Sequence, residues 1–384
     1  MAKKSDQRPL AEKIFLAFFF PAVLAFYLIY KYPTWFVGND PQDLLKFHLF
    51  GKSPGFWYNT LYTTIIVGTC IWVLKTDKNR YQRSKKKGGL STYQRKKFTS
   101  ILLVQLIAFY FFPSVLPGLR QEGGFFNDPP KVSAKTAHVY VYPAVASVGK
   151  GIEKGSVASA GGALYMFLVI PVAVWFFGKR YCSWFCACGN LAETVGVLPW
   201  GQRWVRLYTP RGPTSKKLEI IQVVCLAFAV FFGVMLVVDG LKLFTATSTV
   251  ARLGAIQDFV IDFMFGAIVG VGAYPIFGTR VWCRYGCPMA GGMRLFGKFS
   301  RSKFAVVPND KCKGLGLCTQ ACPMGIDVAA YAHKEKKPIE VAFGLNDTPC
   351  IGCGGCIDVC PVDALSFAPI SGKENAGLEI VSKS

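Results

Sequence analysis

The 384-residue sequence has few charged residues and almost no histidine. Charged residues make up 17% of it, against roughly a quarter in an ordinary soluble domain, while hydrophobic residues make up 52%. This balance excludes a disordered chain and a large water-soluble enzyme, and it indicates a membrane protein. Histidine occurs only at His48, His138 and His333, and no Cys-x2-Cys-His motif is present. We therefore expect no covalent haem and no haem held between paired intramembrane histidines.

The sequence also lacks the glycine-rich motifs that bind nucleotides. No Gly-x-Gly-x-x-Gly follows a predicted strand, and no Walker loop is present. Any nucleotide chemistry would therefore belong to a partner protein. Acidic residues are scarce too, at 22 against 44 Lys and Arg, which gives a formal net charge of +22. Such an excess is typical of nucleic-acid-binding proteins, but in a membrane protein the enrichment of Lys and Arg on the cytoplasmic side explains it better. We predict no nucleic-acid partner.

Long apolar runs are abundant. Six of them are long enough to cross a hydrocarbon core about 30 Å thick, which takes about 20 helical residues. The first has no small-residue cleavage site after it, so we interpret it as a membrane span and not as a signal peptide. The predicted fold is a polytopic α-helical membrane domain over residues 1–300. Its six spans lie near residues 13–31, 56–75, 98–118, 161–178, 218–239 and 256–277.

The basic residues give these predicted spans a direction. Of the 44 Lys and Arg residues, 34 fall on the side that holds the N-terminus, residues 75–97, residues 179–217 and everything after residue 278. Because cytoplasmic loops are enriched in Lys and Arg, we place this side and both termini in the cytoplasm, in a bacterial inner membrane. Topology explains the basic 75–97 segment, and binding of anionic lipid or of an acidic partner is the alternative.

Beyond the last predicted span, the sequence turns polar and carries a cluster-binding motif. Cys350, Cys353, Cys356 and Cys360 follow the spacing Cys-x2-Cys-x2-Cys-x3-Cys-Pro of bacterial ferredoxins. In two-cluster ferredoxins, three of these thiolates bind one cluster and the fourth binds the other. Disulfides are not expected, because cytoplasmic thiols stay reduced. We therefore predict a small α+β two-cluster ferredoxin domain of the bacterial type over residues 301–384.

A second, incomplete motif lies upstream and has Leu315 where the full motif has cysteine. With crossed ligation, one site then receives four thiolates and the other receives three. The predicted ligand sets are Cys322, Cys350, Cys353 and Cys356 for a 4Fe–4S cluster, and Cys312, Cys318 and Cys360 for the other site. Three thiolates suit a 3Fe–4S cluster, or a 4Fe–4S cluster whose fourth iron takes water or another ligand. Loss of the cluster from this half of the domain is the alternative.

Two shorter cysteine motifs follow the fourth and sixth predicted spans. In each, an apolar run is followed by a glycine, basic residues and Cys-x3-Cys, and corresponding cysteines lie 101 residues apart. We call residues 178–188 the first hook and residues 278–288 the second hook. Because internal repeats often place a site at their interface, we expect one shared site. Its candidate ligands are Cys182, Cys186, Cys283 and Cys287, with Cys188 as an additional candidate.

The sequence leaves open what the hooks bind. Four thiolates suit a further iron–sulfur cluster, another thiophilic metal such as copper, or a redox-active thiol pair. Purely structural cysteines are the remaining alternative.

Two carboxylates, Asp258 and Asp262, lie one helical turn apart near the outer end of the last span. Because intramembrane carboxylates are costly, Asp262 is a candidate for proton transfer from quinol, and pairing with Arg252 or Lys242 is the alternative.

Together these motifs resemble those of the membrane polyferredoxins, which have two Cys-x3-Cys-Pro hooks and a cytoplasmic two-cluster ferredoxin domain. The group includes the quinol-dehydrogenase subunit of periplasmic nitrate reductase systems, the nitrous oxide reductase regulator and the cytochrome oxidase accessory protein. The resemblance covers residues 160–368, and Ala187 and Leu315 depart from the pattern. It implies membrane electron transfer with quinone and other redox subunits as partners, such as a cytoplasmic flavoprotein or iron–sulfur protein, or a periplasmic cytochrome.

We therefore expect an electron-transfer component of an oxidoreductase complex, which relays electrons between cytoplasmic clusters and quinone or a partner redox protein. Outer-sphere electron transfer needs no acid–base residue, so no catalytic side chain is predicted. Two other functions fit the same motifs. One is an accessory protein that reduces or handles copper or thiols during assembly of another enzyme. The other is a mainly structural anchor subunit of a larger redox complex.

Overall fold

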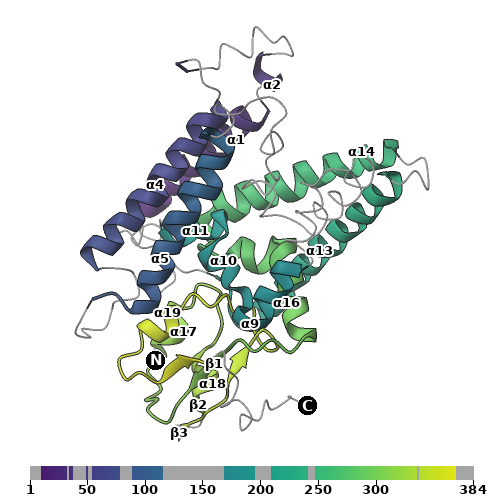
Figure 1. Ribbon diagram of the computed structural model, residues 1–384. Coiled ribbons are helices and arrows are strands. Elements are labelled where there is room, and N and C mark those ends of the chain that lie inside the picture. Colours follow the sequence, from purple (N-terminus) through teal and green to yellow (C-terminus); the bar gives the residue numbers. More distant parts are fainter. Residues whose placement is uncertain are drawn as a thin grey trace.

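A computed structural model shows a mostly helical chain that ends in a small unit of short strands and helices (Figure 1). It describes residues 10–32, 34–37, 49–50, 54–77, 89–115, 168–194, 209–240, 247–334 and 337–368. The helices before residue 300 are α1 (Leu10–Lys31), α2 (Thr34–Val37), α4 (Pro54–Thr76), α5 (Thr92–Val104), the π-helix η1 (Gln105–Val115), α9 (Ile170–Phe177), the 3-10 helix η4 (Gly178–Arg180), α10 (Tyr181–Trp184), α11 (Ala187–Thr194), α13 (Gly212–Gly240), α14 (Thr247–Ile256), the π-helix η6 (Gln257–Gly272), α15 (Tyr274–Phe277), the π-helix η7 (Trp282–Gly286) and α16 (Pro288–Phe299).

These helices form two arms that meet at the hooks. In one arm α4 packs along α5 and η1, and buried Ile66, Val73, Phe98 and Ile101 form its core. In the other arm α13 packs on α14, on η7 and on α16. Figure 1 shows the short hook helices α10, α11 and α16 between the arms and above the C-terminal unit. The hooks therefore lie where all parts of the described chain converge.

Helices cover the described parts of all six apolar runs. Among the described residues, two helices are long and apolar enough to cross a bilayer, namely Gly212–Met235 and Arg252–Gly270. The described parts of the other four runs do not meet that criterion, so the six-span topology stays a prediction. The α13 helix exposes many large apolar side chains, as a lipid-facing helix does. They include Ile220, Val223, Val224, Phe231 and Val234.

Both hooks begin where a glycine ends an apolar helix. Helix α9 ends at Gly178 with φ +62°, and α15 ends at Gly278 with φ +90°. Glycine enters this left-handed region without the steric cost that a Cβ imposes. At Gly178 an added Cβ would also lie 2.5 Å from the ring of Phe304. The glycines of the repeat therefore make the sharp turn that leads each chain segment from its helix into its hook.

The C-terminal unit is built on a three-stranded antiparallel sheet of order β4-β1-β5. Its central pairs join Val306 to Phe343 on one side and to Phe367 on the other. A second sheet pairs β2 with β3. The elements are β1 (Ala305–Pro308), α17 (Leu317–Ala321), α18 (Ala329–Ala332), β2 (His333–Lys334), β3 (Lys337–Pro338), β4 (Phe343–Gly344), α19 (Gly355–Asp358) and β5 (Leu365–Phe367). One continuous core, which includes Cys182, Trp282, Phe304, Met324 and Ile351, runs from the hooks into this unit.

Candidate functional site

The two hooks meet in the structure. Cys182 lies in α10, Cys283 lies in η7, and Cys287 is the N-cap of α16, where its sulfur accepts a 3.4 Å hydrogen bond from the Ala290 amide. The four repeated cysteines are all buried. The thiols of Cys182, Cys186 and Cys283 all lie within electrostatic range of Cys287. The repeat therefore brings its cysteines together, and we call this group the hook site.

Burial governs the chemistry of the hook thiols. It raises the pKa of Cys283, and it raises the pKa of Cys287, where the neighbouring thiols raise it further. Cys188 joins the group through a hydrogen bond to Cys186, which together with burial raises its pKa. A reactive thiol pair needs a lowered pKa. Coordination to a metal centre would instead supply the positive charge that deprotonates the thiols.

Buried side chains from several helices fix the backbone of the hooks. Each donates a hydrogen bond to a carbonyl oxygen within or beside the Cys-x3-Cys segments, so the chain is held in place independently of any bound group. The bonds are Gln222 Nε2 to Cys283 O (3.1 Å) and Cys287 O (3.2 Å), Arg280 Nη1 to Cys182 O (2.8 Å), Tyr274 Oη to Cys188 O (2.8 Å) and Tyr62 Oη to Ala187 O (2.6 Å).

A buried ion-pair network joins the hooks to the first arm. Glu193 of α11 pairs with Lys97 Nζ of α5 at 2.9 Å and with the guanidinium of Arg280 in the second hook. None of these side chains is more than 2% exposed. Burial alone would raise the pKa of the Glu193 carboxyl, but Lys97 and Arg280 lower it to about 2. Glu193 is therefore ionised, and its charge holds two cations in the interior.

The ferredoxin cysteines fall into two groups. The thiol of Cys356 lies within electrostatic range of those of Cys322, Cys350 and Cys353, and the thiol of Cys318 lies within range of those of Cys312 and Cys360. Cys318 also acts more weakly on Cys356, so the two groups are neighbours. The assignment of these two groups to two clusters by crossed ligation stays a prediction. Because the loops of the first set contact the hooks, we call Cys322, Cys350, Cys353 and Cys356 the proximal group. We call Cys312, Cys318 and Cys360 the distal group.

The loops around both groups fit iron–sulfur clusters. Backbone amides point at sulfurs, with Gly352 N donating to Cys350 Sγ at 3.4 Å and Ala364 N donating to Cys360 Sγ at 3.3 Å. Such bonds stabilise cluster thiolates. No group of three His, Cys, Asp or Glu side chains in the described part of the chain is spaced to hold a single metal ion.

The proximal loops lie directly on the hooks. In the first hook Ser183 Oγ donates to Ile351 O at 2.9 Å, and Arg180 lies over the ring of Phe367, 4.5 Å from its centroid. Gly352 approaches Arg180 so closely that a Cβ would lie 2.7 Å from the arginine Cγ. In the second hook the guanidinium of Arg284 donates to the carbonyl oxygen of Met324, two residues after Cys322.

Helix α5 also contacts the proximal loop. Ser91 caps this helix by accepting a hydrogen bond from the Gln94 amide, which orients the first turn toward the ferredoxin unit. The Tyr93 hydroxyl donates to Gly352 O, and both Gln94 Nε2 (3.0 Å) and Lys97 Nζ (3.1 Å) donate to Cys353 O. The first arm, the hooks and the proximal loop therefore form one packed assembly.

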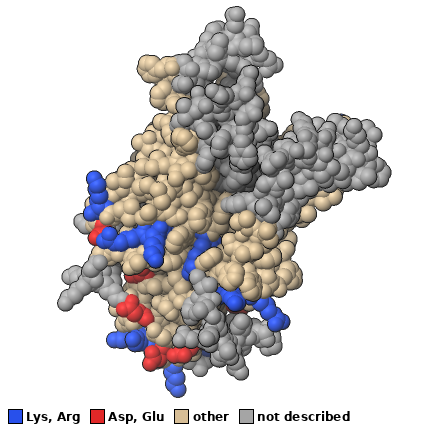
Figure 2. Space-filling model, viewed as in Figure 1, with Lys and Arg blue, Asp and Glu red and all other residues tan. Residues whose placement is uncertain are grey.

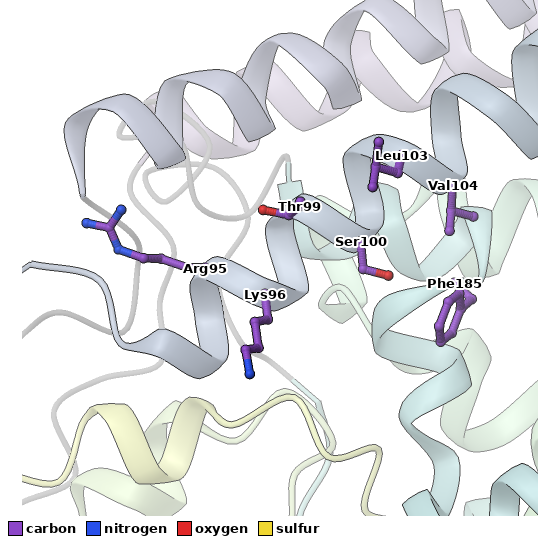
Figure 3. Close-up of a pocket in the computed structure, with 7 residues that line it drawn as sticks. All are labelled: Arg95, Lys96, Thr99, Ser100, Leu103, Val104 and Phe185. Atoms are coloured by element: carbon purple, nitrogen blue, oxygen red, sulfur yellow. The ribbon is translucent and has the colours of Figure 1, made fainter.

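A cavity of about 540 Å³ opens at the surface beside the first hook (Figure 3). Most of its lining comes from α5, and Phe185, which directly precedes Cys186, forms the opposite wall. The lining is apolar at one end and carries cations and hydroxyls at the other. It consists of Arg95, Lys96, Thr99, Ser100, Leu103, Val104 and Phe185.

Comparisons with known proteins found a match to one protein family and several similar proteins. A family profile described as a 4Fe-4S dicluster domain matches residues 304–361. The putative electron transport protein YccM of Escherichia coli is 24% identical over 230 residues, which cover 55% of this chain and 56% of YccM. The ferredoxin-type protein NapH of Haemophilus influenzae is 24% identical over 205 residues, which cover 50% of this chain and 62% of NapH. This chain is similar to the ferredoxin-type protein NapH and to YccM.

Further comparisons set the limits of this relationship. The chain spans a little over half the length of YccM and NapH, so their similarity leaves part of each protein uncovered. A subunit of an ion-translocating oxidoreductase complex from Aliivibrio fischeri is 48% identical, but only over 42 residues, or 11% of this chain and 22% of that protein. No solved structure matches the chain. The similarity to NapH-type polyferredoxins confirms the resemblance inferred from the cysteine motifs.

Several residues of the assembly were absent from the sequence-based prediction. Glu193 and Lys97 stand outside every cysteine motif, and only the rarity of acidic residues in so apolar a chain marks Glu193. Lys179 is one of the basic residues of the first hook, but nothing in the sequence indicates that it is buried. Arg280 was visible in principle, because both hooks carry arginine two residues after their glycine. Asp262 lies in η6, but its side chain is outside the described residues. Its predicted role stays a prediction.

Proposed function

We propose that this chain is a membrane-bound iron–sulfur subunit that relays single electrons between its ferredoxin domain and the hook site, and from there to quinone or a partner redox protein. The observation that carries the proposal is the direct packing of the proximal loops on both hooks, through Ser183 with Ile351 and Arg284 with Met324. Electron tunnelling slows steeply with distance, so two redox sites that share one packed core suit a relay. A flexible linker between the two sites would not keep them within tunnelling distance of each other.

The proposed cofactors follow from the cysteine groups. The proximal group would hold a 4Fe–4S cluster, and the distal group a 3Fe–4S cluster or a 4Fe–4S cluster with a non-cysteine ligand on its fourth iron. The match to a 4Fe-4S dicluster domain supports clusters in this unit. Such clusters accept and donate one electron at a time. For the hook site we propose a further iron–sulfur cluster, because its thiols are numerous, buried and raised in pKa, which disfavours a reactive thiol pair.

The proposed setting is a bacterial inner membrane, crossed six times, with both termini in the cytoplasm. The division into a membrane domain (1–300) and a ferredoxin domain (301–384) is part of this proposal. The apolar exposed face of α13 supports contact with lipid. On the face shown in Figure 2, blue and red side chains lie over the ferredoxin unit and the adjacent helix ends, while the described helices above them are largely tan. This distribution suits a membrane surface between the two regions.

The cavity beside the first hook is our candidate for the quinone headgroup. Leu103, Val104 and Phe185 supply apolar contacts for a ring, and the Thr99 and Ser100 hydroxyls can donate hydrogen bonds to its oxygens. Since Phe185 is bonded directly to Cys186, a bound ring would lie close to the hook site.

Partner subunits in a redox complex are also part of the proposal, because the Aliivibrio fischeri relative is by name a subunit of such a complex.

Cysteine-to-serine variants at Cys182 and Cys283 test the relay. We expect each to lose one metal centre, seen as lower metal content and a missing EPR signal, while the ferredoxin signals persist and quinol-linked electron flux falls to background. Cys225→Ala, which removes a buried thiol of α13 outside the cysteine groups, is the control. It should keep the metal centre and the electron flux of the wild type. Normal flux with a partner enzyme that lacks its metal would support the accessory role. Unchanged flux with failed complex assembly would support the anchor role.

The same EPR measurements test the three-thiolate site. Oxidised wild-type protein is expected to show the signal of a 3Fe–4S centre at low temperature, since the distal group offers three cysteines. A spectrum of 4Fe–4S centres alone, with full iron content, would contradict the 3Fe–4S form. Leu315→Cys restores the missing ligand position and should replace the 3Fe–4S signal with that of a 4Fe–4S centre upon reduction.

A further inference from the structure

Lys179 is a buried cation without a counter-charge in the hook framework. It lies in η4, at the start of the first hook and directly after α9, and its side chain is 0% exposed. Its Nζ has no hydrogen-bond partner in the described part of the protein. Burying an ammonium group without a partner is costly, and buried cations are normally paired or hydrogen-bonded. A group of opposite charge is therefore missing from its surroundings.

The surroundings of Lys179 consist of cysteines from both sites. Burial lowers the pKa of its ammonium group, whereas the neighbouring hook thiols of Cys182, Cys283 and Cys287 raise it, and Arg294 lowers it further. Burial raises the pKa of the Cys350 thiol in the proximal group to about 12, and Lys179 is one of the neighbours that oppose this rise. One buried cation therefore lies within electrostatic range of three hook thiols and one proximal thiol.

The other buried cations of the hooks have partners of their own. Arg280 pairs with Glu193, and Arg284 pairs with Glu219 at 2.9 Å. The second hook has Thr279 where the first has Lys179, so the lysine is not required by the turn that both hooks make. The turn itself is made by the glycines Gly178 and Gly278. A cation between the two sites is thus a feature of the first hook that the repeat does not explain.

We propose that Lys179 is a positioning residue that compensates the charge of two iron–sulfur clusters at once, one at the hooks and one in the proximal group, and thereby raises the reduction potential of both. This proposal rests on the proposed function, which places clusters at these two sites. A cluster bound by four thiolates is anionic and becomes more so by one charge with each electron that it accepts. A buried cation nearby stabilises the reduced form more than the oxidised form, because charges interact strongly in the interior.

The shared position has a consequence for the relay. A cation near only one of two neighbouring clusters would hold the electron there and raise the barrier to its departure. Because Lys179 lies within range of both cysteine sets, it lowers the energy of the electron on either side. Burial and the neighbours Thr319, Cys360 and Cys312 are the main influences on the distal thiol of Cys318, so we expect the distal potential to depend less on Lys179.

EPR-monitored redox titration of the complete membrane protein tests this proposal. Lys179→Met removes the charge and keeps the length of the side chain. We expect the reduction equilibrium of the hook centre and of the proximal cluster to weaken by about tenfold or more, which is about 59 mV toward negative potential for a one-electron couple. The distal centre should shift far less. Lys179→Arg keeps the charge and should leave the potentials near those of the wild type.

Lys311→Met is the matched control, because it neutralises an exposed lysine beside Cys312 of the distal group. It should move all three potentials less than Lys179→Met moves the hook and proximal centres. If Lys179→Met does not load its clusters, Lys179→Gln takes its place in the same comparison. Unchanged hook and proximal potentials in the neutral variant, or an equal shift in Lys179→Arg, would overturn the proposal. A protein whose hooks hold no redox centre would refute that part of the proposed function, while the proximal potential would still test Lys179.

Discussion

The two hooks share one cysteine pattern but contact the ferredoxin unit through different residues. In the first hook, Ser183 donates to Ile351 O in the loop that carries Cys350 and Cys353. Arg180 lies against Gly352 of that loop and over the Phe367 ring of β5. The second hook uses Arg284 to hold the turn after Cys322. The cysteines of a repeat can thus remain symmetric while the residues between them differ. Through these contacts the ferredoxin unit is docked with the proximal group toward the hooks.

The hooks also differ in their buried charges. In the second hook, Arg280 is neutralised by Glu193, which is held in turn by Lys97 from α5. In the first hook, Lys179 has no such carboxylate and lies among cysteines. Arg280 is therefore neutralised by a protein carboxylate, whereas the charge of Lys179 would be neutralised by the proposed clusters. Substitutions that remove these contacts one at a time should change the stability of the protein or its hook centre, and the predictions below begin with the largest expected effect.

Glu193→Gln should have the largest effect on stability. It leaves Lys97 and Arg280 buried without their counter-charge, and removal of one partner from a buried ion pair typically costs about 3–5 kcal/mol. Thermal unfolding of the detergent-solubilised protein would measure the loss. Asp77→Asn is the control, since its ion pair with Arg95 is exposed and such pairs contribute at most about 1 kcal/mol. Equal losses in the two variants would show that the network does not hold the arms together.

The pH dependence of stability offers a second measurement on the same carboxyl. Its pKa is lowered to about 2 in the folded protein, below the value near 4.5 of an unperturbed glutamate. The unfolded chain therefore binds the proton more readily, and Glu193 stabilises the fold at every pH above its unfolded pKa. This contribution is lost as the pH falls from about 4.5 toward about 2. In Glu193→Gln that part of the acid dependence should disappear.

Much of the site could be predicted from the sequence, because spacing along the chain encodes it. The separation of 101 residues between corresponding cysteines indicated that the hooks meet, and the ferredoxin spacing indicated two separate groups. The charge network could not be predicted. Lys97 and Glu193 are 96 residues apart, and Lys97 is 256 residues from the Cys353 carbonyl that it contacts, with no motif linking them. Only tertiary packing of the arms brings such residues together.

The fold was predictable to a lesser degree. Apolar runs indicated helices, and helices cover their described parts, because a long run of apolar residues favours one regular structure in a membrane. Hydropathy could not indicate the breaks inside these runs, such as the change from α5 to η1 at Gln105. Gln105 is buried and donates to Thr63 Oγ1 at 3.0 Å, a contact that depends on a neighbouring helix. The six-span topology stays a prediction.

Replacing Arg180 of the first hook or Arg284 of the second should lower stability by an intermediate amount, and each change should loosen a different loop of the ferredoxin unit. Arg284→Met leaves the buried carbonyl of Met324 without its donor, which costs about 1–3 kcal/mol. Arg180→Met removes ring contacts that contribute about 0.5–2 kcal/mol. Amide hydrogen exchange should accelerate at residues 322–326 in the first variant and at residues 350–354 in the second. Acceleration of both loops in both variants would mean that the hooks do not hold separate parts of the ferredoxin unit.

Cys188→Ala should have the smallest effect, and it tests the symmetry of the hook site. Met289 stands at the corresponding position of the second hook, so Cys188 has no partner in the repeat. Its thiol hydrogen-bonds to Cys186, and its backbone carbonyl is already held by Tyr274. Loss of this thiol removes a bond to one ligand while the four repeated cysteines remain. We expect unchanged metal content and a small shift in the EPR signal of the hook centre. Loss of the metal would instead make Cys188 a ligand and the site asymmetric, with the first hook supplying more thiolates than the second.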